Sequence, residues 1–386
     1  MTLKLPIYMD HHATTPVDPR VLDAMLPYFS QEFGNASSID HIFGARAHEA
    51  VEKAREQVAS SLNARPEEII FTSGATESDN IALLGVAEKM AAKGDHIITC
   101  VTEHKAILDT AKHLEKMGKT ATYLPVDRYG LVDPGDVENA ITDRTILISI
   151  MAANNEIGTI APLKEIGKIA KAHGVLFHTD AAQAVGHIPI DVKEMGIDLL
   201  SLSGHKVYGP KGIGALYIKG ANPKGKVSPV MFGGGHERGI RSGTYNVPGI
   251  VGLGKALEIA QKEMGAESER FRKWTKQMFE AFLESIEDVS LNGHPEKRLA
   301  HNLNVCFPGI ESKALIHLLR NDVAISAGSA CTTTIVEPSH VLIAIGRTVE
   351  ESHSAVRFGL GRGNQEAEVQ EMSSIVIQKI LKLEKI

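Results

Sequence analysis

Between residues 66 and 218 the chain alternates short apolar runs with longer amphipathic stretches. Each run is rich in β-branched residues and ends in a turn, and the stretch after it places apolar residues at helical spacing. This alternation is typical of a parallel sheet covered by helices. The predicted strands are 68–71, 96–101, 121–126, 145–151, 175–178 and 199–202, and the predicted helices include 77–92, 104–117 and 163–173.

Amphipathic stretches also flank this alternating region. A predicted helix at 39–62 has one apolar face, which we expect to pack on the sheet. After Pro248 the pattern predicts two long charged helices, 250–264 and 267–286, which connect to a second domain with its own strands and helices from Val289 onward. The apolar face of the first helix consists of Ala47, Val51, Ala54, Val58 and Leu62.

Composition narrows the class of protein. With 386 residues, 43% hydrophobic and 23% charged, the chain has the totals of a soluble globular protein of two or more domains. A net charge of -6 without a basic block argues against nucleic acid as a partner. The longest apolar run, 146–153, is far too short for a membrane span, and the first ten residues do not resemble a signal peptide. We expect a cytoplasmic protein.

The three cysteines lack C-x-x-C spacing, so neither a disulfide framework nor a structural zinc site is indicated. Cys100 and Cys306 lie in apolar runs and are expected to be buried, whereas Cys331, in SAGSACTTT, sits in a stretch typical of an accessible loop. His11 and His12 could suggest a metal site, but adjacent side chains point to different sides of an extended chain. We therefore expect no structural metal.

Polar and ionisable residues follow the predicted strands. Because a ligand of an open parallel sheet binds beyond the carboxyl ends of its strands, five such ends should bring these residues to one edge. The segment TSGATES also leads into a helix, whose free N–H groups suit a phosphate, although an ordinary capped helix start remains open. The residues at these ends are Thr72 to Thr76, Thr102 to His104, Asn154 to Glu156, Asp180 with Gln183, and Ser203 to Lys206.

Lys206 is the most informative of these residues. Alone it could be a solvated rim charge, and Asp180 alone could be a helix cap. Together with TSGATES, however, they offer what pyridoxal phosphate needs, namely a lysine for its aldehyde, a carboxylate for its ring nitrogen and a cradle for its phosphate. A lysine whose pKa is lowered can form a Schiff base.

Four other side chains have two open interpretations each. His104 could stack on a flat cofactor or move a proton, or cap a helix. Asn155 and Gln183 could hydrogen-bond the cofactor or serve only the fold. Arg357, in VRFGLGR, could bind an amino-acid carboxylate or form a surface ion pair.

Eight segments stand in order along the chain: TSGATESDN, TEHKAILDT, NNEIG, HTDAAQAVG, SGHKVYGPKGIGALY, GGGHERGIRSGT, GSACTTT and VRFGLGR. Together they make the chain resemble the cysteine desulfurases of the iron-sulfur-assembly and nitrogenase-associated branch. These are class V aminotransferase-like enzymes of the fold-type I pyridoxal phosphate group. The resemblance covers about residues 7–362.

This resemblance implies an α/β fold with a large domain, whose mainly parallel sheet is covered by helices, and a smaller α+β domain. The implied boundaries are 1–20 for an N-terminal segment of the small domain, 21–255 for the large cofactor-binding domain, and 256–386 for the small domain with the cysteine loop.

The resemblance also implies roles for individual residues. Lys206 would hold the cofactor's aldehyde, Asp180 its ring nitrogen and Gln183 its ring oxygen, while His104 would stack on the ring as an acid or base. Ala75, Thr76, Ser203 and His205 would surround the phosphate, Asn155 would lie near cofactor and substrate, and Arg357 would bind the substrate carboxylate. Thr244 would reach the phosphate of a neighbouring subunit, which implies a homodimer.

The implied reaction removes sulfur from L-cysteine, releases L-alanine and leaves a persulfide on Cys331. The acceptor would be an iron-sulfur scaffold or another sulfur-accepting protein, and Cys331 could bond transiently to a cluster iron. The chain ends at LKLEKI without the tryptophan-containing tail with which several relatives dock their scaffold, so scaffold docking is left open. A selenocysteine lyase, an aminotransferase and a non-catalytic phosphate-binding module are the alternatives.

Overall fold

The computed structural model describes residues 4–327 and 337–383. A seven-stranded sheet lies at its centre, in the order β2-β8-β7-β6-β5-β3-β4. All neighbouring strands are parallel except β8, which is antiparallel to both β2 and β7. The strands are β2 (Ile69–Thr72), β3 (His96–Cys100), β4 (Thr120–Leu124), β5 (Thr145–Ser149), β6 (Leu176–Asp180), β7 (Leu199–Ser203) and β8 (Gly214–Ile218).

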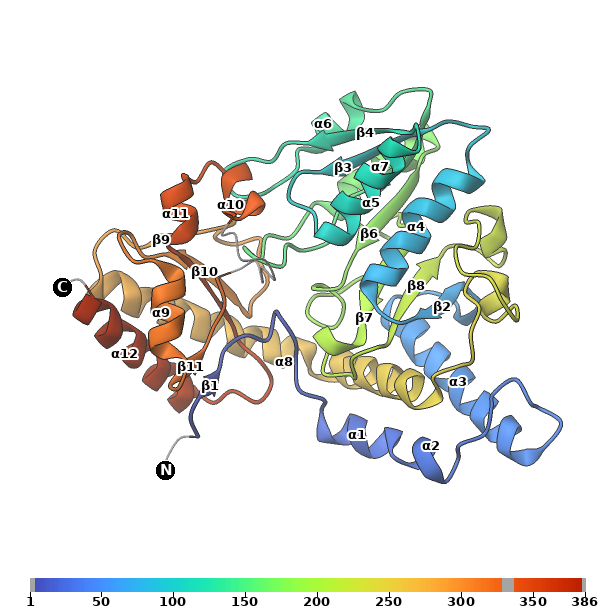
Figure 1. Ribbon diagram of the computed structural model, residues 1–386, viewed down its shortest axis with the longest axis horizontal. Coiled ribbons are helices and arrows are strands. Elements are labelled where there is room, and N and C mark those ends of the chain that lie inside the picture. Colours follow the sequence, from blue (N-terminus) through green and yellow to red (C-terminus); the bar gives the residue numbers. More distant parts are fainter. Residues whose placement is uncertain (1–3, 328–336, 384–386) are drawn as a thin grey trace.

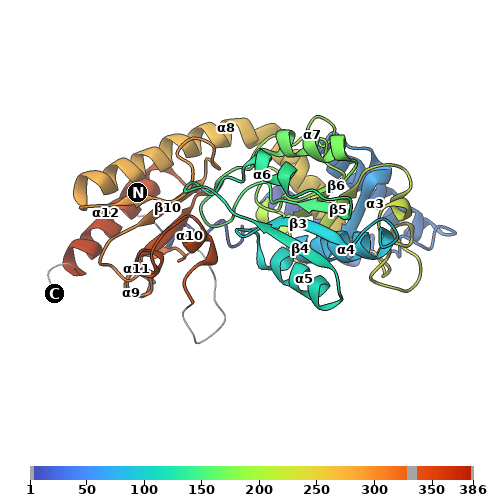
Figure 2. The same ribbon diagram turned by 90° about the horizontal axis from the view of Figure 1, so that it is seen from above.

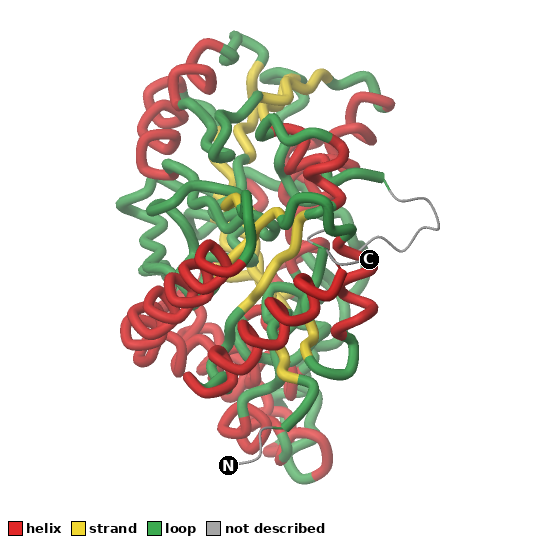
Figure 3. Tube along the Cα trace, turned by 90° about the vertical axis from the view of Figure 1, so that its left-hand side faces the viewer, coloured by secondary structure: helices red, strands yellow, loops and turns green. Residues whose placement is uncertain are grey.

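The predicted strands of this sheet are confirmed within a few residues, and so is the mainly parallel α/β class. The turn at Gly212 lies in the connection from β7 to β8, and these two strands pair antiparallel. Helices lie on both sides of the strands (Figures 1 and 3). They are α1 (Pro19–Met25), α2 (Pro27–Ser30), α3 (Ile42–Ser61), α4 (Ala75–Lys89), α5 (Lys105–Lys116), α6 (Pro134–Asn139) and α7 (Leu163–His173).

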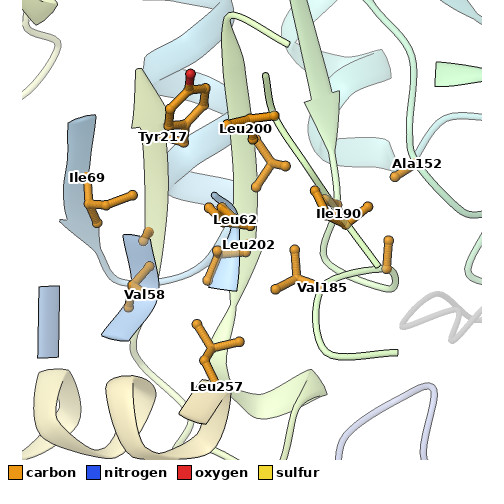
Figure 4. Packing of buried hydrophobic residues seen from close by; sticks show 14 of the residues in the cluster. Val58, Leu62, Ile69, Ala152, Val185, Ile190, Leu200, Leu202, Tyr217 and Leu257 are labelled. Carbon is orange, nitrogen blue, oxygen red and sulfur yellow. The ribbon is translucent and has the colours of Figure 1, made fainter. Parts of the chain in front are cut away.

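One core lies between the sheet and α3, and it contains the predicted apolar face of that helix. Val58 and Leu62 pack towards Ile69, Leu200 and Leu202 in Figure 4. All of the residues predicted for this face are buried. Burying apolar surface stabilises the fold by about 25 cal/mol per Å², so this face holds α3 on the sheet.

The prediction of two helices after Pro248 is wrong. A single helix, α8 (Val247–Ser285), runs through the segment and connects the two parts of the molecule (Figures 1 and 2). The expected break lay at Gly265, but glycine inside a helix costs only about 1 kcal/mol and does not end it. Gly254 lets α8 approach α3 closely, since a Cβ there would lie 2.8 Å from the Cα of Ala54.

The C-terminal part has its own small sheet and core. Strands β9 (Ser290–Leu291), β10 (Asn302–Cys306) and β12 (Ala355–Gly359) are antiparallel, and β1 (Ile7–Tyr8) pairs in parallel with β11 (Val323–Ala324). Helices α9 (Ser312–Leu319), α10 (His340–Ala344), α11 (Val349–His353) and α12 (Glu366–Leu383) accompany them. Ile7 and Met9 pack in the same core as this sheet. The domain boundaries at residues 20 and 255 stay a prediction.

A buried ion pair anchors the 229–246 segment to the large sheet. Both nitrogens at the end of Arg55 donate to the carboxylate of Glu237, at 2.8 and 2.9 Å, and both side chains are almost fully buried. The backbone N–H of Phe71 in β2 also donates to Glu237, at 2.7 Å. Removing one partner of such a pair leaves the other charge buried without compensation.

We therefore expect Glu237→Gln to lower the free energy of unfolding by about 3–5 kcal/mol. Glu52→Gln is the matched control, because Glu52 also pairs with Arg55 but its side chain is 41% exposed, so its loss should cost less than about 1 kcal/mol. Urea unfolding of both variants measures the difference. Equal effects would contradict the importance of burial at this pair.

Candidate active site

One pocket of about 780 Å³ lies at the carboxyl ends of five strands. It is lined by Ser73 to Glu77 after β2, His104 after β3, Asn155 after β5, Asp180 and Gln183 at the end of β6, and Ser203 to Lys206 at the end of β7. The structure thus brings together most of the residues that the sequence predicts at this edge, whereas Thr72, Thr102, Glu103 and Asn154 do not line the pocket. Arg357 reaches the same pocket from β12 of the small sheet.

Thr244, one of the expected site residues, does not line this pocket. It is exposed on the 229–246 segment. Arg241 joins this segment to the start of α4 through an ion pair with Glu77, at 2.7 Å. Cys331 lies outside the described residues.

The amine of Lys206 is buried in the pocket. Its Nζ donates to the carbonyl oxygen of His12 and, at 2.9 Å, to that of Ala13. The pKa of this amine is lowered to about 8, first by burial and then by the positive charge of Arg357, because both disfavour the ammonium form. Near neutral pH Lys206 therefore carries more free, nucleophilic amine than an ordinary lysine does.

Asp180 is the last residue of β6, and Lys206 follows the neighbouring strand β7. Its Oδ1 accepts a hydrogen bond from the backbone N–H of Ala182, at 2.9 Å. Burial raises the pKa of Asp180, because the low-dielectric surroundings disfavour its charged form. A cation in the pocket would counter this effect and keep the carboxylate ionised.

Two further carboxyl groups are buried behind the pocket: Glu103, which was expected at a strand end, and Asp79, which was not predicted. Burial raises the pKa of Asp79 and of Glu103 well above the usual range. Asp79 lies 3.6 Å from the ring of His178, and Glu103 accepts from the backbone N–H of Met151, at 2.7 Å. The signal for Asp79 was its place on the apolar stripe of α4, three and four residues before Ala82 and Leu83.

Arg357 is held at the pocket wall by two acceptors. Its guanidinium donates to Asp10, at 2.9 Å, and to the carbonyl oxygen of Asn155, at 2.7 Å. Asp10 was not predicted, because nothing local in the sequence relates it to a residue 347 positions away. The predicted alternative, a surface ion pair, is wrong, since the side chain of Arg357 is only 4% exposed.

The histidines around the pocket differ in their surroundings. The Nδ1 of His104 caps α5 by accepting from the backbone N–H of Ala106, at 3.1 Å, and the exposed side chain also lines the pocket. His205 bonds to the hydroxyl of Thr14, at 3.2 Å, and burial lowers its pKa to about 4, with the charge of Lys206 as a second cause. His205 is therefore neutral near pH 7.

The start of α4 forms an anion cradle with the end of β7. The N–H groups of the first helical turn have no partner within the helix, and Ala75 and Thr76 in this turn line the pocket. Gly74 precedes this turn with a φ of +155°, a backbone conformation that residues with a side chain rarely adopt. A phosphate fits this set of neutral donors.

These observations fit pyridoxal phosphate. The pocket has the volume of a cofactor site, and it presents an amine, a buried carboxylate that needs a cation, and a phosphate cradle. Gln183 differs from expectation, because both ends of its amide bond to His12.

Among the residues that the structure describes, no group of three or more His, Cys, Asp or Glu side chains could hold a metal ion. Nor does this part of the chain contain a helix long and apolar enough to span a membrane.

Comparisons with known proteins agree with this geometry. Residues 7–372 match the family described as Aminotransferase class-V. The chain is 51% identical to proteins named cysteine desulfurase IscS from Anaeromyxobacter sp. (strain Fw109-5), over 99% of this chain and 94% of the relative, and from Rickettsia massiliae (strain Mtu5), over 99% and 92%.

Solved structures show the same fold. A NifS-like protein superimposes with a TM-score of 0.91 at 38% identity, over 97% of this chain and 99% of the other. A structure described as SspA in complex with cysteine gives 0.81 at 42% identity, over 92% and 98%. The chain therefore belongs to the class-V aminotransferase family, among relatives of the IscS cysteine desulfurases.

Proposed function

We propose that this protein is a pyridoxal phosphate-dependent cysteine desulfurase that converts L-cysteine to L-alanine and passes the sulfur to Cys331. The observation that carries the proposal is the buried amine of Lys206 beside Asp180, with Arg357 at the wall of the same pocket. Similarity to IscS proteins over nearly the full length, at 51% identity, and a neighbouring structure described as a complex with cysteine support this choice of substrate.

Lys206 would have two roles in this reaction. Its free amine would attach the cofactor, with Asp180 at the ring nitrogen and the Ala75, Thr76, Ser203 and His205 cradle at the phosphate. Once displaced by the substrate, the same amine would take the α-proton and later return a proton. Bound pyridoxal phosphate would supply the electron sink that makes bond cleavage at the substrate feasible.

Arg357 and Asn155 would orient the substrate. The guanidinium would bind the amino-acid carboxylate, an interaction that suits its flat pair of donors. Asp10 and the Asn155 carbonyl already fix the direction of this side chain. His104 would stack on the cofactor ring and exchange protons. Gln183 would reach the ring oxygen with the second hydrogen of its Nε2, since the first is donated to the His12 carbonyl.

The sulfur step would be a transfer without an external oxidant. The Cys331 thiolate attacks the substrate sulfur, the C–S bond breaks as an S–S bond forms, and the substrate carbon gains a proton. Cysteine plus enzyme thiol thus becomes alanine plus enzyme persulfide, with atoms and electrons balanced. The persulfide would then pass to an acceptor protein, such as an iron-sulfur scaffold.

We also propose that the protein is a cytoplasmic homodimer. Apolar side chains are exposed along 22–43, an arrangement typical of an interaction surface. Phe232 is 80% exposed in the segment that carries Thr244, which would reach the neighbour's phosphate. Cys100 and Cys306 are buried free thiols, as is usual in a reducing compartment. The exposed apolar residues along 22–43 are Leu22, Leu26, Phe29, Phe33, Ile39, Ile42 and Phe43.

The first test concerns the sulfur carrier. Cys331→Ser should abolish sulfide and alanine formation from L-cysteine while the protein keeps its cofactor colour. Cys100→Ala is the control, because burial raises the pKa of the Cys100 thiol to about 12 and keeps it unreactive. Undiminished turnover in Cys331→Ser would favour an aminotransferase or a selenocysteine lyase, and a colourless protein would favour a non-catalytic module.

The second test concerns the amine. In cofactor-free protein, Lys206 should react half-maximally with acetic anhydride at about pH 8, because acylation requires the free amine and burial favours that form. Exposed lysines should react at about pH 10.4 and serve as internal reference. Mass spectrometry of the labelled peptides measures both. A Lys206 midpoint at the ordinary value would contradict the buried, activated amine.

A third test concerns the subunit contact. Phe29→Glu combined with Phe33→Glu should shift the protein from dimer to monomer, because two charges would be placed in an apolar interface. Sedimentation equilibrium measures the mass. Leu318→Glu, an exposed apolar position on α9, should leave the dimer intact. A dimer that survives the double change would exclude this surface.

A further inference from the structure

Three imidazole rings form a stack behind Lys206. The ring centroids of His12 and His301 lie 4.4 Å apart with 20° between their planes, and those of His301 and His187 lie 4.2 Å apart with 26°. The three residues come from the segment after β1, the turn before β10 and the turn after β6. We refer to His12, His301 and His187 as the histidine column.

The two outer residues of the column bond to Lys206, one to its backbone carbonyl and the other to its side-chain amine. His187 donates from Nε2 to the backbone carbonyl of Lys206, at 2.9 Å. At the other end the side-chain amine of Lys206 donates to the backbone carbonyl of His12. Gln183 fixes His12 in turn, because its Nε2 donates to the His12 carbonyl and its Oε1 accepts from the His12 ring, both at 3.0 Å.

The middle ring belongs to the other part of the molecule. His301 precedes β10, and its backbone carbonyl accepts from the N–H of Leu360, at 2.9 Å, just after β12. It is 3% exposed and does not line the pocket. The small sheet therefore inserts one flat ring between the two residues that hold the lysine.

Two glycines of VRFGLGR make room beside the column. A Cβ on Gly359 would lie 2.8 Å from the His12 ring, and one on Gly361 would lie 2.2 Å from the ring of His11. His11 also bonds to the carbonyl of Gly359, at 2.9 Å. The strand β12, which carries Arg357, thus also fixes the positions of His11 and His12.

The column stays uncharged near neutral pH. Burial lowers the pKa of His12 and of His301 well below the usual value and also lowers that of His187. Arg357 and Lys206 face His12, while Glu267 and Arg362 face His187. Neutral rings can stack here without adding a third positive charge beside the amine and the guanidinium.

We propose that the histidine column positions Lys206, and that His301 does so from the small sheet without touching the lysine or the pocket. Its ring sets the spacing between His12 and His187 and so keeps the amine in its buried place. This inference rests on the proposed function, in which Lys206 is the residue that attaches the cofactor.

The test measures the acylation midpoint of Lys206 in cofactor-free protein. His301→Ala removes the middle ring, so the outer residues can shift and water can reach the amine. We expect the midpoint to rise by about one pH unit towards that of an ordinary lysine. His301→Phe should restore it, since a flat ring again separates the outer pair. His317→Ala, exposed on α9, is the control and should change nothing.

A second pair of variants covers the case in which His301→Ala does not fold. His187→Leu removes the donor to the Lys206 carbonyl, whereas His187→Gln keeps an N–H donor. The midpoint should rise in the first and stay near the parent value in the second. Folded His301→Ala or His187→Leu protein with the parent midpoint would overturn the positioning role.

Failure of this inference can be told apart from failure of the proposed function. Borohydride reduction of the loaded parent enzyme, followed by peptide mapping, shows whether the cofactor is attached to Lys206. Attachment elsewhere would end the proposed function. Attachment at Lys206 together with unchanged midpoints in the column variants would end only the role of the column.

Discussion

The site depends on the burial of one amine. The Lys206 amine can act as a nucleophile only in its uncharged form, and exposure to water would favour the charged form. Carbonyl oxygens of His12 and Ala13 accept its hydrogens, and no carboxylate bonds to its Nζ within the described residues. Burial and the charge of Arg357 lower the pKa of this amine, and they outweigh the opposite effect of Asp180 and Asp10.

Three acidic groups are buried at or behind this pocket, where low-dielectric surroundings favour their protonated, uncharged forms. Asp79, Glu103 and Asp180 are all buried, and burial raises the pKa of each. Of the three, Asp180 lines the pocket. A positively charged ring nitrogen beside Asp180 would favour the ionised form of this carboxylate.

The two parts of the molecule complete the site jointly. The large sheet supplies the amine, the carboxylate and the cradle, while the small sheet supplies Arg357 and the middle ring of the histidine column. Arg362 joins the parts by ion pairs to Asp18 and Glu267, at 2.7 and 2.6 Å, and by its position over the ring of Tyr208. Arg357 and the middle ring of the histidine column are therefore placed by the same interface.

The sequence by itself determined most strands of the large sheet, because the spacing of apolar residues is a local signal. It also determined which residues follow those strands, and the carboxyl ends of parallel strands lie at the same edge of a sheet. It also placed Cys100 and Cys306 in the core, from the apolar runs around them. The sequence predicted a break in α8 near Gly265, but the helix continues there. Its packing against α3 and against the C-terminal core stabilises it where helix propensity alone does not. Tertiary structure alone decided the pairing of Asp10 with Arg357, the burial that activates Lys206 and the stacking of His12, His301 and His187. Such contacts join residues more than a hundred positions apart in the chain. The spacing of apolar and polar residues does not indicate which distant residues meet.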